Sequence, residues 1–185
     1  MACWYRTTQT TQGEIVSSYF QNTTIAGIVL GFSVTGQAAG KLGLLQGNNV
    51  GIVQGTTFQF VNAATTSNNG LWHHGAGTWD GTNMTVYVDG VKSNSIAFSV
   101  APAYNVSNAV SIGSILQPGR GAYYNGSCDE VSIYSRALSA SEILQKYNLS
   151  RQGYPGLLNR VPMTMWGTTA AASSRLLNLR RRAVA

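Results

Sequence analysis

The stretch that most constrains the fold is residues 71–90, LWHHGAGTWDGTNMTVYVDG. Between residues 83 and 88, apolar and polar side chains alternate. A period of two is typical of a strand with one buried face and one solvated face. The buried face is expected to carry Met84, Val86 and Val88, and the solvated face Thr85 and Tyr87.

Asp-Gly dipeptides at positions 80–81 and 89–90 bracket this strand. Both favour tight turns, because glycine accepts a positive φ and aspartate can bond the backbone two residues further on. Residues 72–79 read as another strand ahead of the first turn. The sequence therefore predicts a β-hairpin that starts a second hairpin toward Val91.

Short strand-like segments fill most of the first 150 residues. Only 10% of the chain is charged. Amphipathic helices need charged outer faces, so this composition favours strands joined by turns. The chain is predicted to be all-β, with two packed antiparallel sheets. Besides 72–79 and 84–88, strands are expected at residues 3–8, 14–20, 26–34, 41–46, 50–54, 57–62, 95–100, 110–115 and 128–134.

One short helix is expected late in the chain. Ser139 and Glu142 match a capping box, in which each side chain binds the backbone amide of the other residue. The helix is expected to run to about Tyr147. Ile143 and Tyr147 are four residues apart, so one side of the helix should lie on the sandwich.

The basic charge of the chain lies in residues 151–185. This segment holds six arginines and no acid, whereas residues 1–150 hold six acids and six bases. A nucleic-acid footprint over the whole protein is therefore disfavoured. The tail alone could meet an acidic protein patch, an anionic lipid face or nucleic acid, and we favour an arm that docks on protein subunits. Its docking residues are expected to be Trp166, Arg175, Leu177, Leu179, Arg180, Arg181 and Arg182.

The two cysteines, Cys3 and Cys128, are too few for a disulfide framework and are expected to be free thiols. A bridge between them requires that their strands be neighbours. The first residues lack the apolar core of a signal peptide. No apolar run has the length of a membrane span.

Four sequence blocks occur in an order and spacing that resemble a known family. They are WHHGAGTWDG at 72–81, MTVYVDG at 84–90, IGS at 112–114 and CDEVSIYSRALSASEI at 128–143. Together they resemble the laminin-G-like, concanavalin A-like jelly-roll domain, from about residue 3 to residue 147. The resemblance implies a two-sheet jelly roll in residues 1–150, and recognition of glycans or proteins rather than catalysis.

The chain departs from this family in two ways. The family usually has strands ahead of the one that CWYRTT matches, and the chain begins at that strand. An open sheet edge and an exposed core are therefore expected, to be filled by residues 155–185 or by another chain. In addition, Gly75 stands where the family prefers a bulky apolar residue, which predicts weaker packing there.

Asp129 is the candidate metal ligand. In a regular strand it shares the core-facing side with Val131 and Ile133, so its carboxylate must be bonded or paired. It is expected to anchor turn amides. The alternative is a Ca²⁺ ligand, as in some relatives, but the chain has few carboxylates to complete such a site. No other cofactor is expected.

Catalysis is not expected from the acidic and histidine pairs. Asp129 and Glu130 are adjacent on a strand and should face opposite sides, whereas glycoside hydrolysis needs two carboxyl groups on one side of the sugar. His73 and His74 should likewise face opposite sides, which makes them a poor metal pair. No serine or cysteine context suggests a catalytic triad.

Sugar binding would use aromatic rings and amide side chains at loop ends. The candidates are Tyr123, Tyr124 and Asn125 in the Gly-rich turn, together with Trp79 and Asn83. Two of these candidates have an alternative structural role. Trp79 is of a type more often found in the core, and Tyr123 can simply cover a sheet edge.

These patterns leave three functional hypotheses. The first is a non-catalytic jelly-roll subunit of a larger assembly, such as a phage-type virion surface or decoration protein, whose basic tail docks on neighbouring subunits and which can grip host glycans. The second is a free-standing carbohydrate-binding module of a cell-surface or secreted protein. The third, an enzyme of the glucanase class, has the least support.

Overall fold

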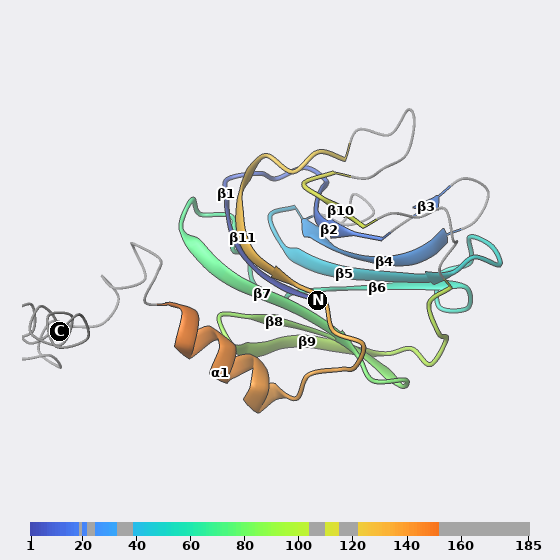
Figure 1. Ribbon diagram of the computed structural model, residues 1–185. Helices are drawn as coiled ribbons and strands as arrows, with labels where there is room; N and C mark the ends of the chain where they lie inside the picture. The colour runs from blue at the N-terminus through green and yellow to red at the C-terminus, as the bar shows by residue number, and fades with distance from the viewer. Residues whose placement is uncertain (19, 22–24, 33–38, 104–109, 115–121, 152–185) are drawn as a thin grey trace, which may run out of the picture.

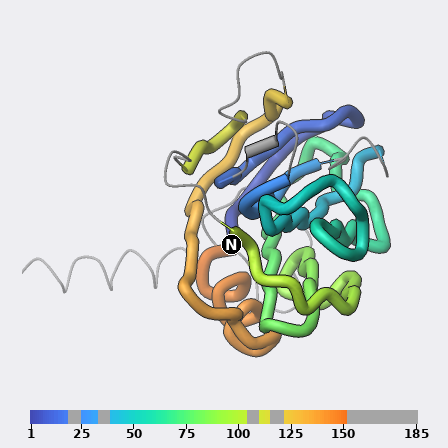
Figure 2. The backbone as a smooth tube through the Cα atoms, turned by 90° about the vertical axis from the view of Figure 1, so that its right-hand side faces the viewer, coloured from blue at the N-terminus to red at the C-terminus, as the bar shows by residue number. Residues whose placement is uncertain are grey.

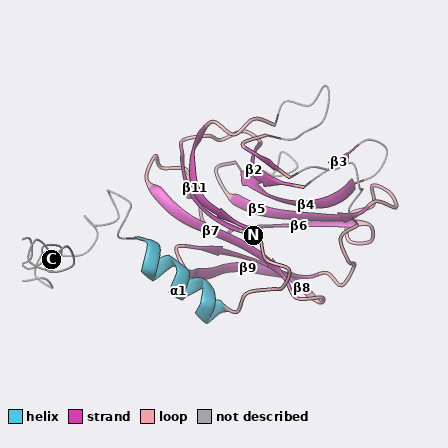
Figure 3. Ribbon diagram, in the orientation of Figure 1, coloured by secondary structure: helices cyan, strands magenta, loops and turns pink. Residues whose placement is uncertain are grey.

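The computed structural model describes residues 1–18, 20–21, 25–32, 39–103, 110–114 and 122–151. These residues form two antiparallel β-sheets packed face to face, with one α-helix outside them (Figures 1 and 3). The predicted all-β sandwich with a late helix is therefore confirmed. Apart from Arg151, the predicted basic arm lies outside the described residues.

Sheet A contains the predicted hairpin. Thr78 pairs with Thr85 across the first turn. The second turn places Asp89 at φ 51° and Gly90 at φ 79°, the left-handed region that Asp-Gly tolerates. In spatial order, sheet A consists of β11 (Gly126–Ser132), β1 (Ala2–Thr7), β7 (Trp72–Trp79), β8 (Asn83–Val88) and β9 (Val91–Ala97).

Sheet B covers the inner face of sheet A. Its central pair, β4 (Ile25–Phe32) and β5 (Leu42–Asn48), keeps one register over seven residue pairs, from Ala26↔Asn48 to Phe32↔Leu42. The short strand β3 (Phe20–Gln21) adds to β4 outside the main order. In spatial order, sheet B consists of β10 (Ser111–Ile112), β2 (Gly13–Ser17), β4 (Ile25–Phe32), β5 (Leu42–Asn48) and β6 (Phe58–Asn62).

The main core lies between the two sheets. Tyr5 of β1 meets Phe32 of β4 edge to face, with 5.2 Å between the ring centroids. The Tyr5 hydroxyl lies 2.6 Å from Ser67 Oγ, so this buried polar group has a partner. Met84 and Val86 are fully buried in the same cluster, as their alternation predicts.

The helix α1 (Ala140–Ser150) begins with the predicted capping box. Ser139 Oγ accepts from the Glu142 amide, and the Glu142 carboxylate accepts from the Ser139 amide. The helix packs on the outside of sheet A, on the side away from sheet B, as the turned view of Figure 2 also shows. Trp4 Nε1 donates to Ser150 Oγ over 2.8 Å and ties the last turn to β1.

The outer face of β8 is not solvated as predicted. Thr85 and Tyr87 are each only 7% exposed. Tyr87 is buried beside Ile143 of α1, and the Thr85 hydroxyl lies 2.9 Å from Ser95 Oγ. The sequence alternation cannot report this burial, because the covering helix comes more than fifty residues later in the chain.

The predicted strand at 50–54 is wrong. Asn49 takes a φ of 63° and ends β5, and the chain then folds back on itself. Thr57 Oγ1 accepts from the Val53 amide over 2.8 Å, and the Thr57 amide donates to the Val53 carbonyl. These local bonds replace a sheet ladder. They leave three apolar side chains on the surface of the loop, Val50, Ile52 and Val53.

The strand predicted at 95–100 is displaced toward the turn. It is β9, which begins directly at Val91 and ends at Ala97. Phe98 leaves the ladder because its amide donates to Thr82 O and its carbonyl accepts from Trp79 Nε1, both over 2.8 Å.

The weak packing predicted at Gly75 is also wrong. A Cβ atom there would lie 2.7 Å from both Leu42 Cδ2 and Tyr5 Cε1. The neighbouring side chains therefore already occupy the space that a larger residue would need.

The cysteines lie on neighbouring strands, since β1 pairs with β11. Both thiols are nevertheless free, with Cys3 buried and Cys128 half-buried. Within the described ranges, no helix has the length and apolar character needed to cross a membrane.

Candidate binding clefts

The residues predicted to bind glycans lie at two separate ends of sheet A. Asn125 precedes β11, and its carbonyl accepts from Thr7 Oγ1 over 2.6 Å, at the last residue of β1. Trp79 ends β7 at the other end of the sheet, because Trp72, the first residue of β7, pairs with Arg6 near the end of β1. The predicted set is therefore two groups and does not form one site.

In the first group, Tyr124 has a structural role, because its hydroxyl and its ring are both held by other residues of the sandwich. Its hydroxyl donates to Arg6 O over 3.1 Å, and its ring stacks on Phe32 with centroids 6.4 Å apart. Burial raises the pKa of Tyr124 well above the usual value. Tyr123 is 70% exposed, and Asn125 is also exposed, so these two remain accessible to a ligand.

In the second group, Asn83 shapes the β7–β8 turn. Asp80 Oδ1 accepts from the amides of Thr82 and Asn83 and from the Thr82 hydroxyl, over 2.7–2.8 Å. These donors lower the pKa of Asp80 to about 2, although the carboxylate is solvent-exposed. The Asn83 side chain in turn donates to Thr82 Oγ1. These contacts hold Asp80 and Asn83 within the turn.

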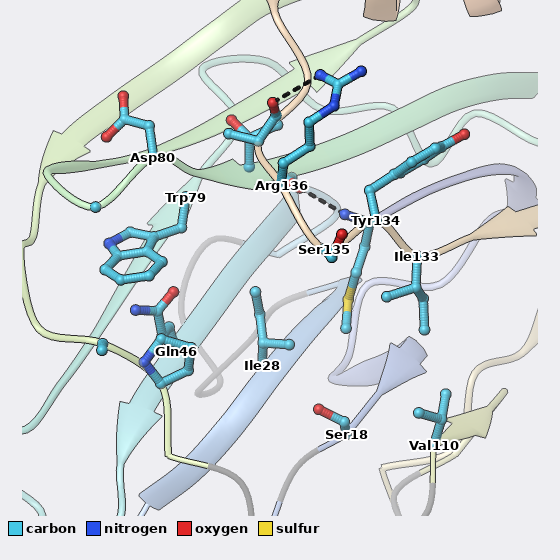
Figure 4. A pocket seen from close by; sticks show the side chains of 17 residues that line it. Ser18, Ile28, Gln46, Trp79, Asp80, Val110, Ile133, Tyr134, Ser135 and Arg136 are labelled. Atoms are coloured by element: carbon cyan, nitrogen blue, oxygen red, sulfur yellow. Dashed lines mark hydrogen bonds between the residues drawn. The ribbon is translucent and has the colours of Figure 1, made fainter.

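Trp79 lines a groove of about 1070 Å³ between the two sheets, called here the inter-sheet groove (Figure 4). Its apolar lining includes Met1, Ile28, Trp79, Val110, Ile133 and Tyr134. Its polar lining includes Ser18, Gln46, Asp80 and Arg136.

Two polar atoms in this groove are buried without a described partner. Gln46 is fully buried; its Nε2 donates to Val100 O over 2.6 Å, but its Oε1 accepts nothing. Ser18 Oγ is also unpaired, and the residue is 6% exposed. Ile28 pairs with Gln46 across β4 and β5, so an apolar wall adjoins the unpaired amide oxygen. The groove is thus apolar with a few polar atoms deep inside it.

A second cleft, of about 590 Å³, lies where the edges of β6 and β9 approach each other. It is called here the amide cleft, because four carboxamide side chains line it together with one lysine and one aromatic ring. These residues are Lys41, Gln54, Gln59, Phe60, Asn62 and Asn94.

Hydrogen bonds connect the amides of this cleft. Gln54 Nε2 donates to Gln59 Oε1 over 3.3 Å, and Asn94 Nδ2 donates to the Asn62 carbonyl over 2.9 Å. Asn62 Oδ1 is buried and has no hydrogen-bond partner among the described residues. Lys41 forms no salt bridge within the described part of the chain. The cleft therefore offers an unused acceptor, an unpaired cation and a half-buried ring.

The sequence did not predict this cleft. Its residues come from three segments, around 41, 54–62 and 94, which only the sheet order brings together. The cluster of glutamine and asparagine at 54–62 was visible in the sequence, but its partner edge was not.

The two histidines face opposite sides of sheet A, as predicted. His73 Nδ1 lies 2.8 Å from Asp89 Oδ2, and its Nε2 lies 3.0 Å from Asn69 Oδ1. His74 lies instead against the Trp4 ring beneath α1, with centroids 5.5 Å apart. His73 thus anchors the Asp89 turn.

The core-facing position predicted for Asp129 is wrong. Glu130 takes a φ of 48°, which breaks the alternation of β11, and Asp129 is exposed. Its Oδ1 accepts from the Glu130 amide over 2.7 Å, a bond to the next residue within β11 rather than to a turn. Within the described residues, no group of three or more His, Cys, Asp or Glu side chains could hold a metal ion.

Comparisons with known proteins point to one family. Residues 1–144 match the family model of the concanavalin A-like lectin/glucanases superfamily. A comparison with curated proteins finds no match.

Several solved structures share the fold. A Bacteroides ovatus protein classed as carbohydrate-binding aligns with a TM-score of 0.59 at 17% identity, over 78% of this chain and 39% of that one. The binding domain of Paraclostridial Mosquitocidal Protein 1 gives 0.56 at 17% identity, over 80% and 36%. The Ruminococcus gnavus IT-sialidase CBM40, bound to α2,3-sialyllactose, gives 0.57 at 15% identity, over 79% and 80%.

These likenesses show the fold, at identities too low to carry residue roles. The chain spans well under half the length of the first two structures.

Proposed function

Since this chain belongs to the concanavalin A-like lectin/glucanases superfamily, we propose that it is a non-catalytic carbohydrate-binding domain whose glycan lies in the amide cleft. The resemblance inferred from the four sequence blocks is confirmed. The solved structures that share the fold of this chain include carbohydrate-binding modules and toxin binding domains, so the fold itself is lectin-like.

The observation that carries the proposal is the unused acceptor in the amide cleft. A buried oxygen without a partner costs folding free energy, so Asn62 Oδ1 is best explained by a ligand hydroxyl that donates to it. Sugar hydroxyls both donate and accept, and the amides of Gln54 and Gln59 can do the same. Phe60 supplies an apolar surface beside them.

Lys41 favours an acidic sugar. It is the only charged side chain in the lining of this cleft, and it has no ion pair within the described residues. A carboxylate or sulfate on the sugar would pair with its ammonium group, which a neutral sugar cannot do.

The clefts lack the means of glycoside hydrolysis. Among the described residues, no carboxyl group lines the amide cleft, and Asp80 is the only one that lines the inter-sheet groove. With a pKa of about 2, Asp80 stays ionised near neutral pH and cannot act as a general acid. Hydrolysis by the usual route needs two carboxyl groups, one of them protonated.

The test is glycan binding by the full chain and by two variants. Gln54→Ala should weaken binding about five- to ten-fold, the loss of one neutral hydrogen bond. Lys41→Met should weaken binding of a sialylated oligosaccharide by about ten-fold or more and leave its neutral counterpart unchanged. Titration calorimetry with the matched sugar pair measures both effects.

Tyr123→Ala is the matched control, because Tyr123 is exposed in the Gly-rich turn that the sequence favoured. It should leave the affinity unchanged. Loss of binding in Tyr123→Ala with full binding in Gln54→Ala and Lys41→Met would overturn the amide cleft and support the turn instead.

A second candidate function is a subunit of a larger extracellular or virion-type assembly. The features that favour it are the exposed apolar loop with Val50, Ile52 and Val53, and the six arginines of residues 151–185. In this proposal the arm grips neighbouring subunits while the sandwich binds glycans. The mass of the native particle in solution tests it, and a monomer at micromolar concentration would rule it out.

A further inference from the structure

The inter-sheet groove is an apolar surface that the described residues leave uncovered. Val110 is 52% exposed, Ile133 50% and Tyr134 37%, and all three line the groove. Figure 4 shows Ile133 and Val110 on the same side of it. Large apolar side chains gathered at one opening mark a contact surface.

The groove also borders sheet edges that can accept a strand. Among the described strands, β11 and β10 have a partner on one side only, so their other edges are free. Exposed edges favour the addition of an extended segment. Two polar atoms inside the groove have no partner among the described residues. Gln46 Oε1 can accept from a backbone amide, and Ser18 Oγ can either donate or accept.

The chain contains a segment of suitable pattern just after the described helix. Between residues 157 and 165 (LLNRVPMTM), four of the five odd positions are apolar, the exception being Asn159, and the even positions hold Leu158, Arg160, Pro162 and Thr164. A period of two with one apolar face is typical of a strand, and Pro162 restricts such a strand to a sheet edge.

Charge complementarity and the length of the linker after α1 both support this segment as the occupant of the groove. Asp129 and Glu130 are exposed on β11, and the segment carries Arg160. Helix α1 ends at Ser150, which binds Trp4, and the groove lies about three to five residues further along the strands, at Met1 and Trp79. When extended, five residues such as 152–156 can span about 17 Å, against about 10–17 Å along the strands. Because α1 lies on the outer face of sheet A, the first residues of the segment itself must also pass around the edge of β11.

We propose that residues 157–165 of this chain dock in its own inter-sheet groove as an added edge strand, with Val161, Met163 and Met165 against Val110 and Ile133. A linker this short gives an effective concentration in the millimolar range, which favours docking within one chain over exchange between two. The arginines after residue 166 stay available to a partner.

The test is amide hydrogen exchange of the full chain, read in peptides covering 131–137 and 157–165. Met163→Asp places a charge on the apolar face and should speed exchange at 131–137 by about ten-fold or more. Thr164→Asp, on the opposite face, is the matched control and should leave the rate unchanged. Equal rates in Met163→Asp and the wild type would overturn the proposal.

A variant on the groove side completes the test. Ile133 is half exposed, so Ile133→Asp should keep the fold while the amides of 157–165 lose their protection. Exchange at 157–165 at the unfolded rate in the wild type would overturn the proposal. So would protection that disappears on dilution, because it would assign the groove to a second copy. None of the three substituted residues is in the described lining of the amide cleft, so glycan binding is tested independently of this proposal.

Discussion

At the scale of single residues, His74 is a side chain whose protonation should change the stability of the fold. It is 2% exposed beneath α1, where it contacts the rings of Trp4 and Tyr147. Burial, assisted by nearby Lys146 and opposed by Asp89, lowers the pKa of His74 from 6.5 to about 4. Its Nδ1 is buried with no partner among the described residues, so a proton there would gain no hydrogen bond from them.

Acid should therefore destabilise the protein through His74. Between pH 6.5 and 4 the unfolded chain binds a proton at this residue that the folded chain does not, so stability falls as the pH falls. The loss should reach roughly 3 kcal/mol at pH 4. Urea unfolding of the wild type and His74→Gln at pH 7 and pH 4 measures it, because carboxylates contribute equally to both proteins. Parallel losses in the two proteins would contradict the prediction.

Where the backbone is regular, the sequence predicts which face of a strand a residue lies on, although not whether that face is covered, as Thr85 and Tyr87 show. The alternation predicts the opposite faces of His73 and His74 and the burial of Met84 and Val86. It fails at Asp129, because the positive φ of the next residue cannot be read from a Cys-Asp-Glu-Val run.

At the scale of elements, α1 depends on its first turn. The helix has eleven residues, and Ile143 is its buried anchor, so its stability needs help from its cap. The Glu142 carboxylate serves twice, since it accepts from the Ser139 amide and pairs with Arg136. The Arg136 partner, together with the Ser139 donors, lowers the pKa of Glu142 to about 2.

Ser139→Ala should lower the free energy of unfolding by about 1 kcal/mol, the usual cost of losing an N-cap side chain. Ser139→Thr keeps the hydroxyl and should change it by a few tenths. Chemical denaturation measures both. A Thr variant as unstable as the Ala variant would mean that the hydroxyl is not the cause.

Elements were predictable where turn chemistry marks both ends. The β7–β8–β9 hairpins follow from two Asp-Gly turns, and α1 follows from its capping box. Residues 50–54 were not predictable, because an apolar run in a loop has the same letters as a short strand. The bonds between Val53 and Thr57, which fold these residues into a loop instead of a strand, are local and leave no periodic pattern in the sequence.

At the scale of the whole molecule, the sheet order decides the candidate sites. The amide cleft forms because β6 and β9 are both edges, and the inter-sheet groove opens where β10 and β11 are the opposite edges. Strand patterns predict how many strands pack but not their order, so neither cleft could be predicted. Of the predicted site residues that the structure describes, Trp79 alone lies in the lining of either cleft.

The sheet order also sets how deeply each thiol is protected. Cys3 lies on β1, between β11 and β7, and is 1% exposed. Burial, with a contribution from nearby Cys128, raises the pKa of Cys3 to about 12. Cys128 lies on the edge strand β11 and is half-buried, so it becomes accessible when that edge alone opens. The two thiols therefore report openings of different extent.

Alkylation by iodoacetamide should consequently modify Cys128 at least about ten-fold faster than Cys3 under native conditions, because local opening of an edge costs less than global unfolding. The Cys3 rate should rise with urea in parallel with global unfolding, whereas the Cys128 rate should depend on it weakly. Peptide mass spectrometry follows both sites, with Cys128→Ser as the control that assigns them. Equal alkylation rates at Cys3 and Cys128 would contradict the prediction and would mean that β1 detaches together with β11. An intact mass that shows a Cys3–Cys128 disulfide would also contradict it, because the two neighbouring strands would then be covalently joined.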